Sequence, residues 1–249
     1  MKKLFIKIIS IFIFPKTRRR EFRRAYLRCG VGKLKIKGRN NRFILVKEDG
    51  KEISINWPLS GLNIEIKGNN NTIKIGHPWH FENTKIKITD DNNYFEIKSC
   101  PMAVKETLFC VNRGAKVLIG ENFCVSGYGR SSFFVGEEDG MSLIIGNNVL
   151  FATNNTVRTS DSHTIYDIKT DKICNFGSPI VIHDHVWICE GCAILKGAQI
   201  AQDCIIGTKS VVNKKFDTPN AIIVGTPAKI VKTGINWDVE RIPDFKGIG

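Results

Sequence analysis

The segment from Arg158 to Pro179, RTSDSHTIYDIKTDKICNFGSP, concentrates side chains that can move protons. It contains His163, with Asp161 and Asp167 on either side and Tyr166 nearby. Histidine has an ordinary pKa of about 6.5, so an imidazole can both accept and return a proton near neutral pH. A long loop in a compact domain is usually functional or disordered, and this density of proton-transfer groups favours function. We therefore take His163 as the first candidate for a catalytic residue.

Asp161 lies two residues before His163. In an extended loop, positions i and i+2 share a face, so this carboxylate has the reach to orient the imidazole or to bind a substrate hydroxyl. It also fits the simpler role of capping a turn. The sequence leaves these interpretations open.

The loop interrupts a strict repeat that resumes over residues 180–213. Aliphatic residues recur at every sixth position, and a small or slim residue follows four positions after each of the first five. The aliphatic positions are Ile182, Ile188, Ile194, Ile200, Ile206 and Val212, and the small ones are Val186, Cys192, Ala198, Cys204 and Ser210. A period of six is neither the helical 3.6 nor the alternation of a single strand. It predicts a β-solenoid with short flat sides, each adding one aliphatic side chain to a stacked core.

The same repeat extends toward the amino terminus in a looser form. Six-residue steps return from Ile119 and from Ile145, and the segments that begin at Ile36, Ile66 and Ile88 share a Gly or Asp followed by paired Asn. Asn and Gly tolerate the left-handed backbone of tight corners, and stacked Asn side chains can form amide ladders. We therefore predict an all-β chain built as one parallel β-solenoid from about Lys33 to Val224.

The expected organisation has four parts. They are a basic amphipathic segment at 1–30, irregular coils at 33–114, strict coils at 115–224 with the loop 158–179, and a short tail at 225–249 that packs back across the last coils.

Charge is concentrated at the amino terminus. The chain has a formal net charge of +13, and residues 1–30 supply +9 of it, with ten Lys and Arg against Glu21. The remaining body is close to +4, which argues against a nucleic-acid-binding protein. The apolar run at 1–14 is too short to span a bilayer, which needs about 20 residues, and no small-residue cleavage site follows it. Residues 1–28 are expected either to lie on an anionic membrane face or to cap the solenoid as a short helix, and both alternatives predict a cytoplasmic protein.

The cysteines do not suggest a disulfide framework. The chain has eight, but no secretory signal is visible, and three of them fall on the repeat, where a thiol fills a small apolar slot. Cys189 and Cys192 form one CxxC pair without the second pair of a zinc knuckle. We expect free thiols and no metal.

The strict repeats, the SDSHTIYD loop, the VWIC turn and the closing VGTPAKIV together resemble the hexapeptide-repeat acyltransferases, most of all the O-acetyltransferases that modify bacterial capsule and lipopolysaccharide sugars. The resemblance covers roughly residues 115–233. It implies a left-handed β-helix, a homotrimer, acetyl-CoA bound in clefts between subunits, and a sugar or polysaccharide hydroxyl as acceptor. Three positions depart from the family pattern, because His183, Cys189 and Glu190 stand where Gly or another small residue is usual.

By this resemblance His163 is the catalytic base, and the oxyanion donor is a backbone N–H of a neighbouring coil. Trp187 follows His163 by 24 residues, a spacing at which related sialic-acid-polymer O-acetyltransferases use a Trp at the thioester. Trp187 also fits an outward position that the whole family shares. The other positions expected to hold acetyl-CoA are Glu190 and Thr208 along the groove, and Asn213, Lys214, Lys229 and Lys232 near its phosphates.

Three other functions remain as alternatives. The acceptor is an amino sugar in the first, which would make the enzyme an N-acetyltransferase. The chain is a non-catalytic scaffold or glycan-binding solenoid in the second. In the third it is a zinc enzyme resembling the γ-carbonic anhydrases, with His163, His183 and His185 as ligands.

Overall fold

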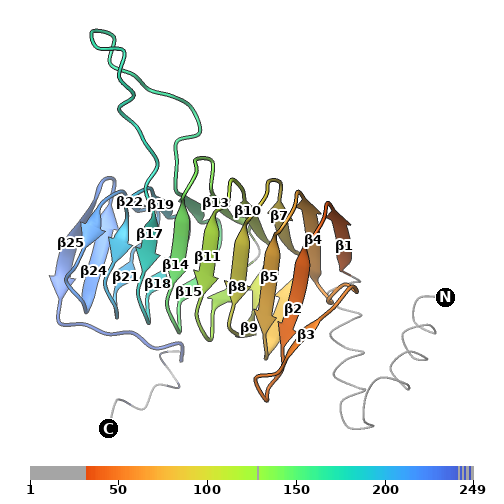
Figure 1. The fold of residues 1–249 in the computed structure, drawn as a ribbon. Helices are drawn as coiled ribbons and strands as arrows, with labels where there is room; N and C mark the ends of the chain where they lie inside the picture. The colour runs from red at the N-terminus through yellow and green to blue at the C-terminus, as the bar shows by residue number, and fades with distance from the viewer. Residues whose placement is uncertain (1–31, 128, 241, 243, 245–246, 248–249) are drawn as a thin grey trace.

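The computed structural model describes residues 32–127 and 129–240, together with 242, 244 and 247. The predictions for residues 1–30, a short helix and a membrane contact, lie outside the described residues. Within the described part the secondary structure consists of strands and turns, and no helix there is long and apolar enough to cross a membrane. The strands wind into a left-handed parallel β-helix with three flat sides (Figure 1), which confirms the predicted fold class.

The first side, sheet A, has eight parallel strands in the order β1-β4-β7-β10-β13-β16-β19-β22. They are Lys33–Lys37 (β1), Leu62–Lys67 (β4), Thr84–Ile88 (β7), Thr107–Val111 (β10), Ser131–Val135 (β13), Thr156–Arg158 (β16), Ala193–Leu195 (β19) and Val211–Val212 (β22).

The second side, sheet B, is parallel except at its amino-terminal edge, where a short strand turns back against β2. Its strands are Arg42–Val46 (β2), Glu52–Ser54 (β3), Thr72–Gly76 (β5), Tyr94–Ile97 (β8), Lys116–Ile119 (β11), Ser142–Ile145 (β14), Ile180–Ile182 (β17), Gln199–Ile200 (β20) and Lys215–Phe216 (β23).

The third side, sheet C, ends in an antiparallel pair, because the last strand folds back on β24. Its strands are Trp79–Glu82 (β6), Cys100–Lys105 (β9), Cys124–Val125 (β12), Leu150–Phe151 (β15), Trp187–Ile188 (β18), Ile205–Ile206 (β21), Ala221–Gly225 (β24) and Ala228–Thr233 (β25).

The core is a set of columns that run through the solenoid from coil to coil. All six aliphatic residues at the six-residue positions are buried, and so are the small residues that follow them. In the middle coils the columns widen to aromatic side chains: Phe109 stacks on Phe133 with ring centroids 4.7 Å apart, and Phe133 packs edge-on against Phe151 at 5.2 Å. The repeat therefore predicts correctly which side chains point inward.

The corner between sheets A and B carries the expected amide ladder in the amino-terminal coils. The Asn41 side-chain oxygen accepts hydrogen bonds from the backbone and side-chain N–H groups of Asn71, and Asn71 is bonded in the same way by Asn93. The residues just before them, Asn70 and Asn92, have φ of 57° and 60°. Asn is one of the few residues that adopts this left-handed conformation at low cost, so the paired Asn segments form the tight corners.

After β25 the chain runs back along sheet C to Trp237. The Trp237 indole N–H donates a hydrogen bond of 2.9 Å to the His185 carbonyl, and its ring stacks on the His185 ring at 4.5 Å. The Nδ1 of His185 lies 2.8 Å from Asp203. This contact fastens the carboxy-terminal segment to the corner between sheets B and C.

Candidate active site

An arm, residues 159–179, leaves the solenoid between β16 and β17, at the corner between sheets A and B (Figure 1). It extends well beyond the coils, and its outer part is closed by a bridge between Tyr166 and Ile173. Large apolar side chains on the arm face solvent in the single chain, with Ile168 85% exposed and Phe176 66% exposed. Such exposure on a protruding segment indicates a surface that another molecule covers.

His163 lies on the arm, beside a hollow of about 360 Å³. The hollow is lined by Arg113, Glu137, Glu138, Asp139, Ser162, His163, Thr164, Ile173, Asn175 and Phe176. The turn after β13 supplies its acidic wall, the turn after β10 supplies Arg113, and the arm supplies the rest. The His163 side chain is exposed in the single chain, so it is accessible to a substrate.

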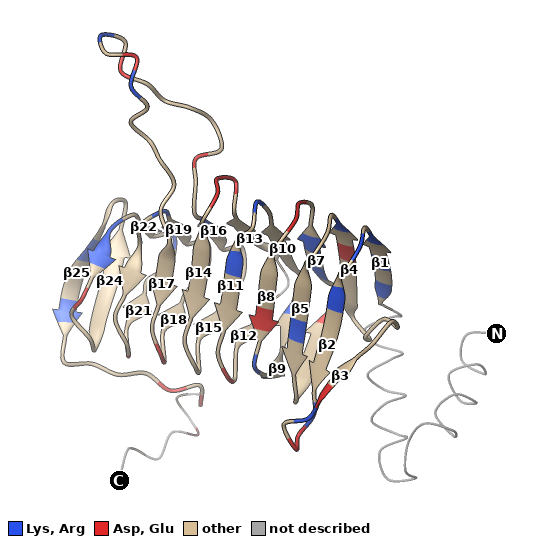
Figure 2. Ribbon diagram, viewed as in Figure 1, with Lys and Arg blue, Asp and Glu red and all other residues tan. Residues whose placement is uncertain are grey.

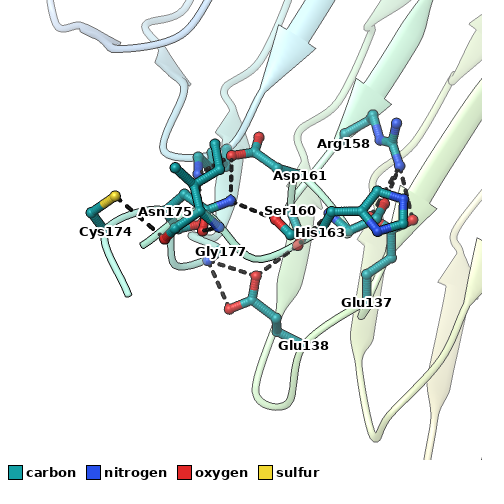
Figure 3. A network of polar contacts seen from close by, with 12 residues as sticks. Glu137, Glu138, Arg158, Ser160, Asp161, His163, Cys174, Asn175 and Gly177 are labelled. Atoms are coloured by element: carbon teal, nitrogen blue, oxygen red, sulfur yellow. Dashed lines mark hydrogen bonds and ion pairs between the residues drawn. The ribbon is translucent and has the colours of Figure 1, made fainter. Parts of the chain in front are cut away.

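Glu138 holds both ends of the arm together (Figure 3). Its carboxylate accepts a hydrogen bond of 2.6 Å from the Ser160 hydroxyl and bonds of 2.9 and 2.8 Å from the backbone N–H of Gly177. The Ser160 hydrogen bond, followed by that of Gly177, lowers the pKa of Glu138 from its ordinary value. The carboxylate is therefore ionised at neutral pH and fixes the arm where it joins the solenoid.

Asp161 bonds to the solenoid and not to the imidazole. Its carboxylate accepts a hydrogen bond of 2.6 Å from Lys196 Nζ and one of 3.1 Å from the Asn175 side-chain amide. These two hydrogen bonds, with that of Lys196 the larger cause, lower the pKa of Asp161. The same Asn175 amide donates a hydrogen bond of 2.8 Å to the backbone carbonyl of His163. Among the described residues, no hydrogen bond joins the Asp161 carboxylate to the His163 ring. Asp161 thus positions the backbone on which His163 stands.

Arg158, where the arm begins, is fixed in a similar way. Its guanidinium donates to Glu137 at 2.9 Å and to the Ser162 hydroxyl at 2.6 Å, and it lies over the Phe134 ring at 5.1 Å. Arg158 therefore holds Ser162, the residue before His163, in place before any substrate is present.

The residues expected to bind acetyl-CoA fall on two different edges of one chain. Asn213 and Lys214 lie between β22 and β23, at the same sheet A–sheet B corner as the arm. Trp187 lies on β18 in sheet C, and Glu190 and Thr208 follow at the corner between sheets C and A. Lys229 and Lys232 lie on β25 in sheet C. One chain brings each group together but keeps the two groups apart.

Trp187 is half-buried, and its ring lies 5.8 Å from that of Trp237. Glu190 accepts a weak hydrogen bond of 3.4 Å from Asn154. The sequence did not single out Glu138, Asn175, Lys196 or Trp237, because each is one polar or aromatic residue among many until the fold places it beside its partner.

Metal chemistry finds no support in the geometry. Within the part of the chain that the structure describes, no group of three His, Cys, Asp or Glu side chains is arranged to hold an ion. His163 is on the arm, whereas His183 and His185 lie at the corner between sheets B and C, so a single chain does not bring the three histidines together. The seven described cysteines are free thiols, and burial raises the pKa of Cys189 to about 11. This thiol is therefore neutral at physiological pH.

Sequence comparison finds sugar O-acetyltransferases. The chain is 30% identical over 126 residues to a polysialic acid O-acetyltransferase of Escherichia coli O1:K1, a match that covers 50% of this chain and 39% of that protein. It is 28% identical over 205 residues to the polysialic acid O-acetyltransferase of Neisseria meningitidis, covering 78% and 89% of the two chains. A galactoside O-acetyltransferase of Escherichia coli K12 is 29% identical over 120 residues, covering 48% and 55%.

Structure comparison gives the same fold. The polysialic-acid-specific acetyltransferase NeuO superposes with a TM-score of 0.69 at 24% identity, over 86% of this chain and 92% of the other. The polysialic acid O-acetyltransferase OatWY superposes with a TM-score of 0.68 at 22% identity, over 87% of this chain and 95% of the other. No protein-family model matches the chain. The chain spans 39% of the length of the Escherichia coli O1:K1 relative and 42% of the length of a putative acetyltransferase of Schizosaccharomyces pombe, to which it is 37% identical over 90 residues. The predicted resemblance to the hexapeptide-repeat acyltransferases, and to sugar O-acetyltransferases among them, is confirmed.

Proposed function

We propose that this protein transfers the acetyl group of acetyl-CoA to a hydroxyl of a bacterial surface polysaccharide or of its precursor. The observation that carries the proposal is an imidazole held beside a hollow by an anchored arm, in a chain whose sequence matches include several sugar O-acetyltransferases. The relatives act on polysialic acid and on galactosides by name, which supports a sugar as the acceptor class.

The chemistry needs a base, an oxyanion donor and a proton for the leaving group. His163 takes the proton from the sugar hydroxyl as its oxygen attacks the thioester carbonyl. The tetrahedral oxyanion is stabilised by a backbone N–H of a neighbouring coil. The intermediate collapses as the C–S bond breaks, and the imidazolium returns the proton to the thiolate of coenzyme A. The products are the sugar acetate ester and free coenzyme A, so atoms and charge balance.

The acetyl donor site is proposed to lie between two copies of the chain. His163, Asn213 and Lys214 are at one edge, whereas Trp187 and Thr208 are at another, so a second copy must present its edge to complete the site. The exposed apolar residues of the arm supply a surface suited to that contact. A closed ring of such head-to-tail contacts is a cyclic assembly, and we propose a homotrimer.

In this assembly Trp187 packs along the acyl-bearing arm of acetyl-CoA, with Glu190 and Thr208 lining the same groove. Lys214, Lys229 and Lys232 attract its phosphates as point charges. We further propose a cytoplasmic location, where acetyl-CoA is supplied, with a peripheral membrane contact through residues 1–28.

The test is incubation of the full chain with acetyl-CoA and a panel of glycans and nucleotide sugars, with free thiol release as the readout. Release is expected with one class of hydroxyl acceptor and not with amino sugars blocked at every hydroxyl. His163→Ala is expected to lower the rate by about 10²–10⁴-fold, the usual contribution of a general base. His183→Ala, an exposed histidine at another corner, is the matched control and should keep the rate. Full turnover in His163→Ala would remove the proposed base.

A further inference from the structure

The outer face of sheet A in the amino-terminal coils is strongly basic. Eight side chains point outward from β1, β4 and β7, and six of them are lysines, with one asparagine and one glutamate. We call this surface the lysine face and define it by Lys33, Lys35, Lys37, Lys67, Lys85 and Lys87. Its blue segments are visible on β1 and β7 in Figure 2.

In-register pairing brings these charges close together. Lys37 lies directly opposite Lys67 on the neighbouring parallel strand, and like charges in such positions repel. Glu65, the glutamate of the face, bonds to Lys85 at 2.9 Å and to Lys67 at 3.3 Å, and these contacts lower its pKa to about 2. Within residues 32–127, no ion pair neutralises Lys35 or Lys87. The face therefore keeps a net positive charge.

The adjoining side of the same coils is balanced, which shows that the basic character is local. On sheet B, Lys74 lies between two acids and pairs with Glu52 at 2.7 Å and with Glu96 at 3.4 Å. The charge of the lysine face is thus not a general property of these coils.

The lysine face is hollowed as well as charged. A hollow of about 290 Å³ opens on it, and it is lined by Lys33, Lys35, Asn63, Ile64, Glu65 and Lys85. Ammonium donors, one amide and one carboxylate around a hollow suit a ligand that offers both carboxylates and hydroxyls.

One row of this face leads straight to the arm. In strand register, Lys35 is followed by Glu65, Lys87, Cys110, Phe134 and Arg158. The Cys110 thiol in the middle of the row has a pKa that is raised by burial, and it lies among the cations Lys87, Lys85 and Arg130 and the carboxylate Glu137. Arg158 then bonds to Ser162, the residue before His163. At ~4.8 Å between strands, the row is roughly 24 Å long, a span that holds several sugar units.

We propose that the lysine face binds a linear, carboxylate-bearing polysaccharide and holds it along sheet A so that one of its units lies at His163. The inference rests on the proposed acetyl transfer and names the class of acceptor: an anionic polymer, not a neutral or monomeric sugar. An anionic membrane would also attract lysines, but membrane-bound faces combine cations with large exposed apolar side chains. The lysine face has only Ile36, at 39% exposure, among its described strands.

The test measures binding of the full chain, without acetyl-CoA and at low ionic strength, by isothermal titration calorimetry. The probes are polysialic acid, a dextran of matched length as the neutral polymer, and phosphatidylglycerol vesicles. The double variant Lys35→Gln, Lys87→Gln is compared with Lys98→Gln, Lys116→Gln, which removes the same charge from exposed lysines outside sheet A. Matched thermal unfolding midpoints establish that both variants are folded.

The proposal predicts that polysialic acid binds and dextran does not, and that added salt weakens binding. Loss of two ion pairs in Lys35→Gln, Lys87→Gln should raise the Kd about tenfold, whereas the control pair should leave it within about twofold. In the transfer assay KM for the polymer should rise with kcat unchanged.

Four results would overturn the proposal: no binding of the polymer by the wild-type chain, equal binding of dextran, binding of vesicles in place of the polymer, or an unchanged Kd in Lys35→Gln, Lys87→Gln. Each leaves acetyl transfer to a short acceptor untouched. Lysine-dependent polymer binding with no transfer to any acceptor would instead contradict the proposed function alone.

Discussion

Two carboxylates beside His163 act on the backbone that carries it. Asp161 bonds to Lys196 across the corner, and Glu138 bonds to Ser160 and Gly177, one residue at each end of the arm. A catalytic imidazole on a long loop needs such support, because a small misplacement of a reacting group is costly in rate. At the scale of single residues, then, the candidate site depends as much on its anchors as on its base.

The Glu138 anchor should weaken in acid. Its pKa is lower in the folded protein than its ordinary value of 4.5, so its contribution is complete above that value and is lost as pH falls through the lower folded value. Hydrogen exchange of the arm, read on a peptide that contains Gly177, should be slow and constant from about pH 7 to pH 5 after correction for intrinsic rates. At pH values well below 4.5, where the carboxylate becomes protonated in the folded protein, the protection should disappear.

In Glu138→Gln, hydrogen exchange of the Gly177 peptide should be fast already at neutral pH, because a neutral amide replaces the charged acceptor. Asp139→Asn is the matched control in the same turn, since its carboxylate is 87% exposed and lies 3.9 Å from its nearest cation, Arg113. If Glu138→Gln protected the arm as well as the wild type does, the anchoring role would be wrong.

At the scale of the elements, the amide ladder fixes how one coil sits on the next. The Asn93 side chain is 1% exposed, donates to the Asp90 carbonyl and accepts from the Ala115 backbone N–H. One hydrogen bond contributes about 0.5–1.5 kcal/mol to the free energy of unfolding, and the buried Asn93 amide makes several of them.

Asn93→Ala should therefore lower the free energy of unfolding by about 2–4 kcal/mol, because it removes the hydrogen bonds that the buried amide makes with Asn71, with the Asp90 carbonyl and with the Ala115 N–H. Chemical denaturation measures this directly. Asn92→Gly is the control, since Asn92 is exposed with φ of 60° and glycine adopts that conformation freely; we expect a change within about 0.5 kcal/mol. Equal stability of Asn93→Ala and the wild type would contradict the structural role of the ladder.

The solenoid follows from the sequence because its signal is local and repeated. The six-residue period predicts which side chains point inward, and residues such as Ile194 and Cys204 are buried as predicted. Pairing along the arm does not follow in the same way. Asp161 meets Lys196, 35 residues away, and Gly177 meets Glu138, 39 residues away, because of coil register and the direction in which the arm leaves. No periodic pattern encodes those two facts.

The sequence also did not predict the antiparallel strand β3 or the contact of Trp237 with His185. Both lie where the repeat is absent, at the edge of sheet B and after the last coil. Regions without a period have to be placed by tertiary packing, which a single sequence does not reveal.

For the whole molecule, the decisive feature is the separation of two half-sites. The arm with His163 stands at the corner of sheets A and B, and Trp187 stands on sheet C. The proposed site exists only where one copy presents the first edge to the second edge of another. Activity should therefore depend on assembly, and each complete site should draw on two chains.

Subunit complementation between His163→Ala and Trp187→Ala tests this claim most directly. The two variants are co-expressed with different tags, mixed assemblies are isolated through both tags, and acetyl-CoA-dependent thiol release is compared with that of each parent. The account predicts that mixed assemblies regain activity well above either parent, because some interfaces pair an intact His163 with an intact Trp187 from the neighbouring copy. Mixed assemblies no more active than their parents, or a fully active wild-type monomer, would contradict it.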